Sequence, residues 1–334
     1  MKRIEFKTIG TKAIALAATA AIGATVLLGG GLHSAAEGSV VKASEEIMAT
    51  ATAEGAARSV GNGGAEASAR RINYNLPGIP SRNISTYRQR SVVYGNKKLN
   101  SPALVVNDII YVNLREVAST VAGADYTYNK NTKRATVSAR GLLLTATDLG
   151  YVIYANDRPQ FSFSPVFSTS GGEVYVPAAV LERALGIKRA GLTSSEIRYT
   201  GEYKPLAAAK NYYREDEVYW LAKIISAESS GEALLGQIAV GDVILNRVKS
   251  NLFPNTIYSV IFDKKYGVQF SPTADGRIYA NPTYTATLAA KICLEGISLS
   301  DDAMYFLNPR TAQSNWIVKN KRYVYTIGNH DFYA

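Results

Sequence analysis

The sequence predicts an α+β protein with two folded domains behind an N-terminal extension. Residues 91–200 contain short runs of β-branched and aromatic residues separated by turn residues, a pattern typical of small antiparallel sheets. After residue 211, apolar residues recur at the spacing of an amphipathic helix. With 334 residues, 47% of them hydrophobic, the chain can build a core in each part. We therefore expect an α+β middle domain at 86–203 and a mainly helical domain with a small β part at 204–334.

The first 36 residues have the pattern of a secretory signal peptide. Basic residues from Lys2 to Lys12 precede an uncharged apolar stretch, Ala13 to Leu32, and small residues follow at 34–36. The apolar stretch approaches the length that spans a membrane, so a retained membrane anchor stays open as the alternative. Either outcome places the remaining chain outside the cytoplasm, and we expect a secreted or cell-wall location.

The composition excludes several kinds of site. Cys293 is the only cysteine, so no disulfide can form within the chain, and two histidines, His33 and His330, are too few for a His-rich metal site. The sequence therefore indicates no metal and no organic cofactor. A net charge of +10 favours association with polyanions, and export argues against nucleic acid. We expect peptidoglycan and anionic wall polymers as partners, while the oligomeric state stays open.

Residues 37–85 have the composition of a flexible linker. They are rich in Ala, Gly, Ser and Glu, and they show little apolar periodicity. Such a segment buries too little apolar surface to offset the entropy lost on ordering. We expect a tether between the leader and the middle domain.

The middle domain is expected to begin with a hairpin and a helix. Within 103–112, two apolar runs flank Asn107-Asp108, a dipeptide that favours a tight turn. A helical stretch from Leu114 to Val121 follows, and Gly123 comes directly after it, as expected for a C-cap.

The same order of elements returns further along the chain. Val174–Pro177 resembles Tyr111–Asn113, and a short helix from Val180 to Leu185 stops at Gly186. We expect two βα repeats that pack as one α+β domain.

The residues that repeat also indicate a family. The Tyr-Val-Asn-Leu-Arg-Glu-Val pattern from Tyr111, and Tyr-Val-Pro from Tyr175, resemble the domain named for the N-terminus of copper amine oxidases. Such domains are often attached to secreted wall proteins. The resemblance implies no amine oxidation, because the chain has no three-histidine copper site. It leaves two roles open, binding to the wall and a structural spacer.

The C-terminal domain opens with a helix that ends in a candidate catalytic acid. Acidic residues at 215–217 occupy the first turn, where they face the positive end of the helix dipole. Apolar residues follow at helical spacing up to Ile225, and Glu228 lies three residues later, near the same stripe. A carboxylate there loses hydration, so its pKa should rise, and a protonated carboxyl group is what glycosidic cleavage needs. By spacing alone, a surface glutamate at a frayed helix end fits better than a catalytic one, because Ser229-Ser230-Gly231 indicates that the helix stops there.

The residues that follow Glu228 decide between these readings. Ala227-Glu228 precedes Gly231-Glu232, then the stretches 236–240 and 244–248. This order resembles the SleB-type cell wall hydrolases, the spore cortex-lytic enzyme family. Further stretches match in order to the end of the chain: Phe253–Thr256, Val260–Phe262, Gln269–Ser271, Ala274–Gly276, Ala303–Pro309, Trp316 and Ile327–Tyr333.

The resemblance implies a lysozyme-like catalytic domain in which Glu228 is the general acid and base. It implies cleavage of peptidoglycan at the MurNAc–GlcNAc β-1,4 bond by a lytic transglycosylase or muramidase. Two departures limit what it implies about the substrate. Ser229-Ser230 stands where many relatives have Ala-Arg, and the accessory domain differs from the wall-binding module of the cortex-lytic prototype. Spore cortex and vegetative wall therefore both stay open.

Other residues of the domain are expected to support the site or to contact the sugar. Glu232 could be a second catalytic carboxylate, but the sequence favours a structural or capping role for it. Structural support is expected from Glu232, Asn246, Arg247 and His330. Aromatic rings stack on sugars and amides bond to their polar groups, so the expected substrate-binding residues are Gln237, Gln269, Phe270, Tyr305, Phe306, Asn308 and Trp316.

Two rival functions remain. A cysteine-dependent wall amidase or peptidase would use Cys293 with His330, although Cys293 falls inside an apolar helical stretch where a reactive thiol is not expected. A non-catalytic wall-binding protein would keep the fold without activity, and the intact motif around Glu228 argues against it.

Overall fold

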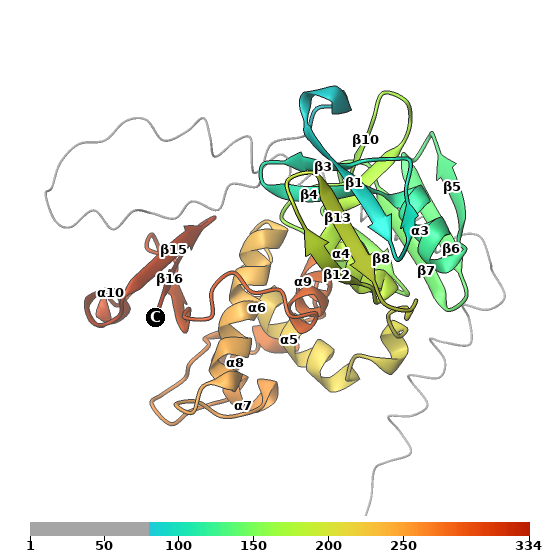
Figure 1. Cartoon of the computed structure of the whole chain (residues 1–334). Coiled ribbons are helices and arrows are strands. Elements are labelled where there is room, and N and C mark those ends of the chain that lie inside the picture. The colour runs from blue at the N-terminus through green and yellow to red at the C-terminus, as the bar shows by residue number, and fades with distance from the viewer. Residues whose placement is uncertain (1–79) are drawn as a thin grey trace, which may run out of the picture. The chain divides into compact units, whose positions relative to one another are not determined.

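The computed structural model describes residues 80–334, and the leader and most of the linker lie outside this range (Figure 1). No helix in the described range is long and apolar enough to cross a membrane. The middle domain contains the elements η1 (Ile84–Thr86), β1 (Arg88–Tyr94), β2 (Lys97–Lys98), β3 (Ala103–Val106), β4 (Ile109–Asn113), α3 (Leu114–Ala122), β5 (Asp125–Asn129), β6 (Arg134–Ala139), β7 (Leu142–Thr147), β8 (Val152–Ala155), β9 (Arg158–Phe161), β10 (Phe167–Ser168), β11 (Val174–Pro177), α4 (Ala178–Leu185), β12 (Lys188–Leu192) and β13 (Glu196–Thr200).

The strands of the middle domain form two sheets. The larger has the order β10-β11-β4-β3-β1-β13-β12, with β2 paired to β1, and the smaller is the meander β5 to β9. The expected hairpin is confirmed: Asn107 (φ 49°) and Asp108 (φ 63°) both adopt left-handed conformations between β3 and β4. Positive φ at both turn residues matches the right-handed twist of the strands, which explains the choice of Asn-Asp here.

Both helices of this domain end where the glycines predicted. The residue after α3 is Gly123 (φ 59°), and the residue after α4 is Gly186 (φ 69°). At Gly186 a Cβ atom would lie 2.1 Å from the carbonyl oxygen of Lys204, so this position cannot hold a side chain without a backbone shift. The strand before each helix, β4 and β11, pairs with the other in antiparallel register.

Residues before position 86, the expected start of the middle domain, already contact that domain. Arg82, assigned to the linker from its composition, donates hydrogen bonds to Asp148 Oδ2 (2.7 Å) and to the carbonyl oxygen of Ser168 (2.9 Å). This attachment depends on partners 66 and 86 residues away, so composition alone did not reveal it.

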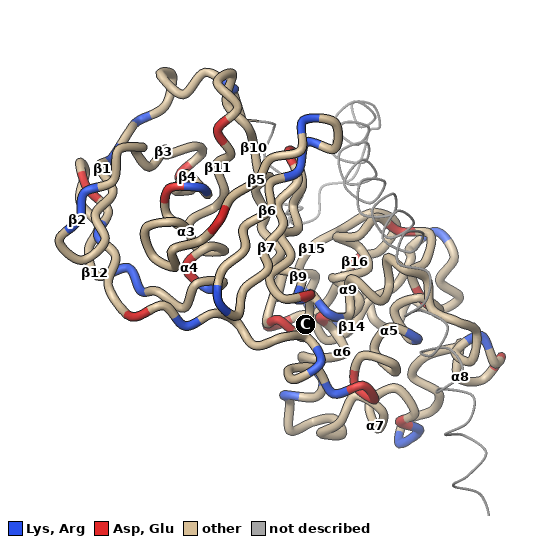
Figure 2. Tube along the Cα trace, turned by 90° about the vertical axis from the view of Figure 1, so that its right-hand side faces the viewer, with Lys and Arg blue, Asp and Glu red and all other residues tan. Residues whose placement is uncertain are grey.

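The C-terminal domain is built on three packed helices with a small sheet, as expected for its mixed composition. Lys and Arg residues are distributed along the traces of both domains (Figure 2). The three-stranded sheet has the order β14-β16-β15. The elements are η2 (Ala209–Asn211), α5 (Glu215–Ser229), α6 (Leu234–Lys249), α7 (Ile257–Ile261), α8 (Pro272–Asp275), η3 (Arg277–Tyr279), α9 (Tyr284–Leu294), β14 (Tyr305–Leu307), α10 (Trp316–Asn320), β15 (Tyr323–Ile327) and β16 (His330–Tyr333).

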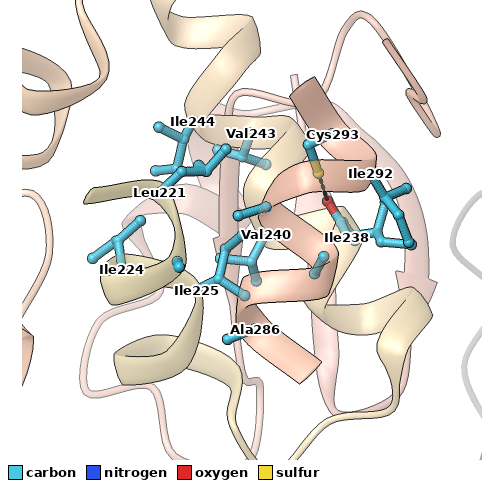
Figure 3. Packing of buried hydrophobic residues seen from close by; sticks show 14 of the residues in the cluster. Leu221, Ile224, Ile225, Ile238, Val240, Val243, Ile244, Ala286, Ile292 and Cys293 are labelled. Carbon is cyan, nitrogen blue, oxygen red and sulfur yellow. Dashed lines mark hydrogen bonds between the residues drawn. The ribbon is translucent and has the colours of Figure 1, made fainter. Parts of the chain in front are cut away.

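Helices α5, α6 and α9 pack so closely that one contact requires glycine. Their apolar side chains interdigitate in the core shown in Figure 3. A Cβ atom at Gly241 of α6 would lie 2.8 Å from Cys293 Sγ of α9 and 2.8 Å from Ile225 Cδ1 of α5. Gly241 therefore allows the other two helices to approach α6, and it fixes the position of the helix that carries Glu228.

The middle domain contacts the C-terminal domain through buried side chains. Residues Tyr151, Val152 and Phe161 belong to the same apolar cluster as the core of α5, α6 and α9. Arg158 of β9 pairs with Glu295 directly after α9, through Nε to Oε1 and Nη2 to Oε2, both at 2.8 Å. Both side chains are only 5–6% exposed, so the two domains share a core and a buried ion pair.

Candidate active site

Helix α5 places Glu228 at its C-terminal end, as the periodicity predicted. Leu221, Ala222, Ile224 and Ile225 are buried, which holds the apolar face of the helix against α6 and α9. Glu228 is the penultimate residue of α5 and is partly buried. Its carboxyl group therefore lies where the apolar face meets the protein surface.

Burial changes the acidity of Glu228 in the direction that the sequence predicted. Desolvation raises the pKa of the Glu228 carboxyl to about 7, with the positive charge of Arg277 acting against this rise and the negative charge of Asp275 adding to it. A carboxyl group with a pKa near 7 is present in both protonation states at neutral pH. It can therefore donate a proton and later accept one.

The sequence did not identify Arg277 as a site residue, and the structure places it beside Glu228. Its Nη1 donates to the carbonyl oxygen of Ala227 (3.2 Å), and its Nε donates to Asp275 Oδ2 (2.9 Å). Arg277 directly follows the stretch 274–276, which resembles the family, so the sequence pointed to this neighbourhood but not to Arg277 itself. Proximity to Glu228 could not be read from it, because 50 residues separate Arg277 from Ala227.

Glu232 is held by the β15–β16 turn. Its carboxylate accepts hydrogen bonds from the backbone nitrogen of Asn329 (3.1 Å) and from Asn329 Nδ2 (2.8 Å). A Cβ atom at Gly328 would lie 1.9 Å from Glu232 Oε2, so only glycine lets the turn approach this closely. These contacts fit the structural role expected for Glu232 better than the role of a second catalytic carboxylate.

Cys293 lies inside α9, and His330 lies beside Glu232. Its Nδ1 is 3.8 Å from Glu232 Oε1, and burial lowers its pKa below the ordinary value although Glu232 acts against this. The Sγ of Cys293 instead donates to the carbonyl oxygen of Ile238 at 3.4 Å (Figure 3). Burial raises the pKa of this thiol well above its ordinary value. The geometry therefore argues against a cysteine–histidine pair.

Asn246 and Arg247 hold the segment that leads into β14. Asn246 Nδ2 donates to the carbonyl oxygens of Ser300 (2.7 Å) and Ala303 (3.1 Å), and Arg247 Nε donates to that of Met304 (2.8 Å). Burial lowers the pKa of Arg247 to about 10. The guanidinium group also lies 4.8 to 5.3 Å from three aromatic rings, those of Phe253, Phe270 and Tyr305.

Two residues expected to bind substrate lie in the interior. Gln237 is 2% exposed and its Nε2 donates to the carbonyl oxygen of Glu232 (2.8 Å), while Phe270 is 3% exposed beneath Arg247. Their buried positions fit support of the Glu232 loop and of Arg247 better than contact with a sugar. The matching motifs indicated that Gln237 and Phe270 belong to the catalytic domain. They did not show whether these side chains face the substrate or the interior.

The remaining candidates are closer to the surface. Trp316 is 53% exposed, and the Nζ of Lys321 lies 5.6 Å from its ring and 4.3 Å from the ring of Tyr305. Phe306, Gln269 and Asn308 are partly buried; Asn308 accepts a hydrogen bond from the backbone nitrogen of Arg310 (3.0 Å) and so shapes its own turn. Within residues 80–334, no three His, Cys, Asp or Glu side chains gather to hold a metal ion.

Two segments of the chain match known families. Residues 231–333 match the family described as Cell Wall Hydrolase, and residues 92–190 match the Copper amine oxidase N-terminal domain. Glu228 lies just before the first of these segments, and Arg277 lies inside it.

Similar proteins are found for the C-terminal domain. The spore cortex-lytic enzyme of Bacillus cereus is 41% identical over 122 residues, which cover 36% of this chain and 46% of that protein. The enzyme of the same name from Bacillus subtilis (strain 168) is 38% identical over 120 residues, or 36% of this chain and 38% of that protein. The chain thus spans less than half the length of these curated relatives.

Solved structures of isolated catalytic domains also match. The catalytic domain of the germination-specific lytic transglycosylase SleB from Bacillus anthracis is 40% identical, and the match covers 37% of this chain and 98% of that domain, with a TM-score of 0.34. The catalytic domain of the Bacillus cereus SleB protein is also 40% identical, over 37% of this chain and 94% of that domain, with a TM-score of 0.33.

Proposed function

We propose that this protein cleaves the glycan strands of peptidoglycan at MurNAc–GlcNAc β-1,4 bonds, because residues 231–333 match the family described as Cell Wall Hydrolase. Sequence identity of 40% to one catalytic domain described as a germination-specific lytic transglycosylase supports this reaction. The observation that carries the proposal is Glu228, whose pKa of about 7 suits an acid that gives up a proton and then recovers one.

The proposed reaction uses Glu228 twice. The protonated carboxyl group donates its proton to the glycosidic oxygen as the C1–O bond breaks and the leaving sugar departs as an alcohol. The resulting carboxylate then removes a proton from the C6 hydroxyl group, whose oxygen closes a 1,6-anhydro ring on C1; in a muramidase it removes the proton from water instead. Arg277, by its positive charge, favours the carboxylate between the two steps.

The lytic transglycosylase route needs no second carboxylate, and this agrees with the position of Glu232. A glycosidase that uses a pair of carboxylates needs the second one free to reach water or the sugar. Glu232 is bonded to the Asn329 turn and its side chain is 9% exposed. The geometry thus argues against Glu232 as the second member of a carboxylate pair.

Replacement of Glu228 tests the proposal. Glu228→Gln keeps the shape of the side chain and removes the acid, so the release of fragments from peptidoglycan should fall by roughly 10²–10⁴-fold. Circular dichroism should show an unchanged fold. Mass spectrometry of the wild-type digest should detect anhydro-muramic ends. A folded variant with more than about a tenth of the wild-type rate would contradict the role of Glu228, by the same estimate.

Several finer properties belong to the same proposal. We infer that the catalytic domain has a lysozyme-like arrangement and that β4–α3 and β11–α4 are repeats, since each strand leads into a short helix capped by a left-handed glycine. We also infer export to the cell wall, from the leader pattern in 1–36. The target is spore cortex or vegetative wall, and digestion of both materials distinguishes them.

The middle domain is proposed to add attachment or spacing without chemistry. A pull-down of the full chain carrying Glu228→Gln with wall sacculi, at low and high salt, measures attachment. Binding that weakens with salt would indicate an electrostatic contribution from the basic chain.

A further inference from the structure

A hollow in the surface of the C-terminal domain lies on a different face of α5 from Glu228. It has a volume of about 420 Å³ and is lined by the segment that joins the two domains, by the first half of α5, and by α9 together with Pro282 just before it. Ala222 at its floor precedes Glu228 by six residues, which is about 9 Å along the helix and a rotation of roughly 240°. The hollow is therefore separate from the candidate active site.

One edge of this pocket approaches the catalytic end of α5. Pro282 lines it, and the next residue, Thr283, donates its backbone N–H to the Oγ of Ser226 (3.1 Å). Ser226 is two residues before Glu228. The pocket edge at Pro282 thus lies near the end of α5 that carries Glu228.

The pocket combines an apolar floor with two cations that have no acidic partner. Val218 and Ala222 form the floor, and the ammonium groups of Lys210 and Lys291 border it. No ion pair to either lysine is present within residues 80–334. Glu215 also lines the pocket and opposes them, so the lining keeps one net positive charge.

The wall contributed by the joining segment is fixed by the buried interdomain ion pair. The hydroxyl group of Tyr213, which lines the pocket, donates to Glu295 Oε1, and Glu295 is also bound by Arg158 and by Gln160 Nε2 (2.9 Å). Although burial acts to raise it, hydrogen bonds from Arg158, Tyr213 and Gln160 hold the pKa of Glu295 below its ordinary value. Glu295 stays ionised, and Tyr213 stays in place.

We propose that this pocket binds the acidic, alanine-containing peptide that branches from peptidoglycan strands, and so acts as a specificity site for strands that carry peptides. The inference rests on the proposed function. Alanine methyl groups fit the floor at Val218 and Ala222, and the free carboxylates of such a peptide are complementary to Lys210 and Lys291. The phosphates of an anionic wall polymer would pair with the lysines but would leave the apolar floor without a partner.

Direct binding tests the site independently of cleavage. The full chain carrying Glu228→Gln is titrated with a tetrapeptide of wall composition that has two alanines and free carboxylates. Lys291→Glu or Lys210→Glu should raise its Kd about three- to ten-fold, whereas Glu215→Gln should lower it. Lys249→Glu, an exposed site on α6 outside the pocket, should leave the Kd unchanged. Amidation of the peptide carboxylates should weaken binding as much as the lysine variants do.

Cleavage assays then separate this inference from the proposed function. With an active Glu228, Lys291→Glu should slow digestion of strands that carry peptides and leave strands stripped of peptides unaffected. Equal Kd values for all variants, or equal competition by a glycerol phosphate oligomer, would overturn the peptide site. If no glycan is cleaved by the wild type while the lysine-dependent binding persists, the proposed function fails and the binding site stands.

Discussion

At the scale of single residues, the acidity of Glu228 links stability to the proposed reaction. Its pKa in the folded chain, about 7, lies above the ordinary 4.5 because burial disfavours the carboxylate. A carboxyl group with a raised pKa stabilises the fold below its unfolded pKa, and this contribution is lost as the pH rises through the folded pKa. The free energy of unfolding is therefore lower at the pH values at which Glu228 is ionised.

Glu228→Gln should consequently make the protein more stable at pH 8 than the wild type. The gain should be roughly 1–3 kcal/mol at pH 8 and close to zero at pH 4, with the change falling between pH 4.5 and 7. Urea unfolding of both proteins at the two pH values measures it. Glu202→Gln, at an exposed position, controls for the loss of a carboxylate. A gain of equal size at both pH values would show that burial of charge is not its cause.

Cys293 provides a second test at this scale. Its thiol is 2% exposed and bonded to the carbonyl oxygen of Ile238, so alkylating reagents should not reach it in the native protein. We expect Cys293→Ala to keep wall lysis within a few-fold of the wild type. A folded but inactive Cys293→Ala variant would support the rival cysteine-dependent enzyme.

At the scale of elements, the position of α5 depends on its neighbours as much as on its own sequence. Acidic residues in its first turn and the apolar stripe account for its start and its buried face. Its distance from α6 and α9 depends on Gly241, where a side chain would meet Cys293 and Ile225. A single residue of α6, Gly241, thus affects where α5 and the candidate catalytic residue Glu228 lie.

Gly241→Ala should destabilise the protein by roughly 1–3 kcal/mol through overpacking, less the gain in helix propensity of about 1 kcal/mol. Adding Cys293→Ala removes the sulfur atom that the new methyl group meets, so the double variant should cost less than the sum of the single ones. Thermal unfolding of the four proteins measures the coupling. Gly231→Ala, where no neighbour lies within 4 Å of the added Cβ, is the matched control. Strict additivity would rule out the contact as the cause.

At the scale of the whole molecule, the two domains are joined by more than a linker. Residues 204–334 contain the whole segment that matches the cell wall hydrolase family, 231–333. The structure adds the Arg158–Glu295 pair and the apolar contacts of Tyr151 and Phe161 with the hydrolase core. A fragment that lacks the middle domain leaves Glu295 without its cation, so we expect it to be less stable although it retains the catalytic residues.

The buried pair itself provides the sharper test. Arg158→Ala leaves a buried charge without a partner and should cost about 3–5 kcal/mol, whereas Arg158→Met with Glu295→Met should cost much less because no charge remains buried. Denaturant unfolding of the full chain measures both. Arg214→Ala breaks an exposed ion pair with Asp216 and should have no measurable effect. A double variant as unstable as Arg158→Ala would show that the charges were not responsible.

The sequence by itself determined the features that depend on near neighbours. The Asn107-Asp108 turn, the ends of α3 and α4 and the course of α5 all follow from residues within a few positions of each other, because turn preference and helical periodicity act over that range. The family of the catalytic domain was also recognisable, because its motifs occur in order along the chain.

Only the tertiary structure decided which distant residues meet. Arg277 bonds to Ala227, next to Glu228, across 50 residues. Asn329 holds Glu232 across 97, and Arg158 pairs with Glu295 across 137. It also showed that Gln237 and Phe270 face the interior. Such contacts depend on how helices and sheets pack, and packing selects among many arrangements that share the same local pattern. For this reason the catalytic acid could be found from the sequence, while its charged neighbour and the coupling of the two domains could not.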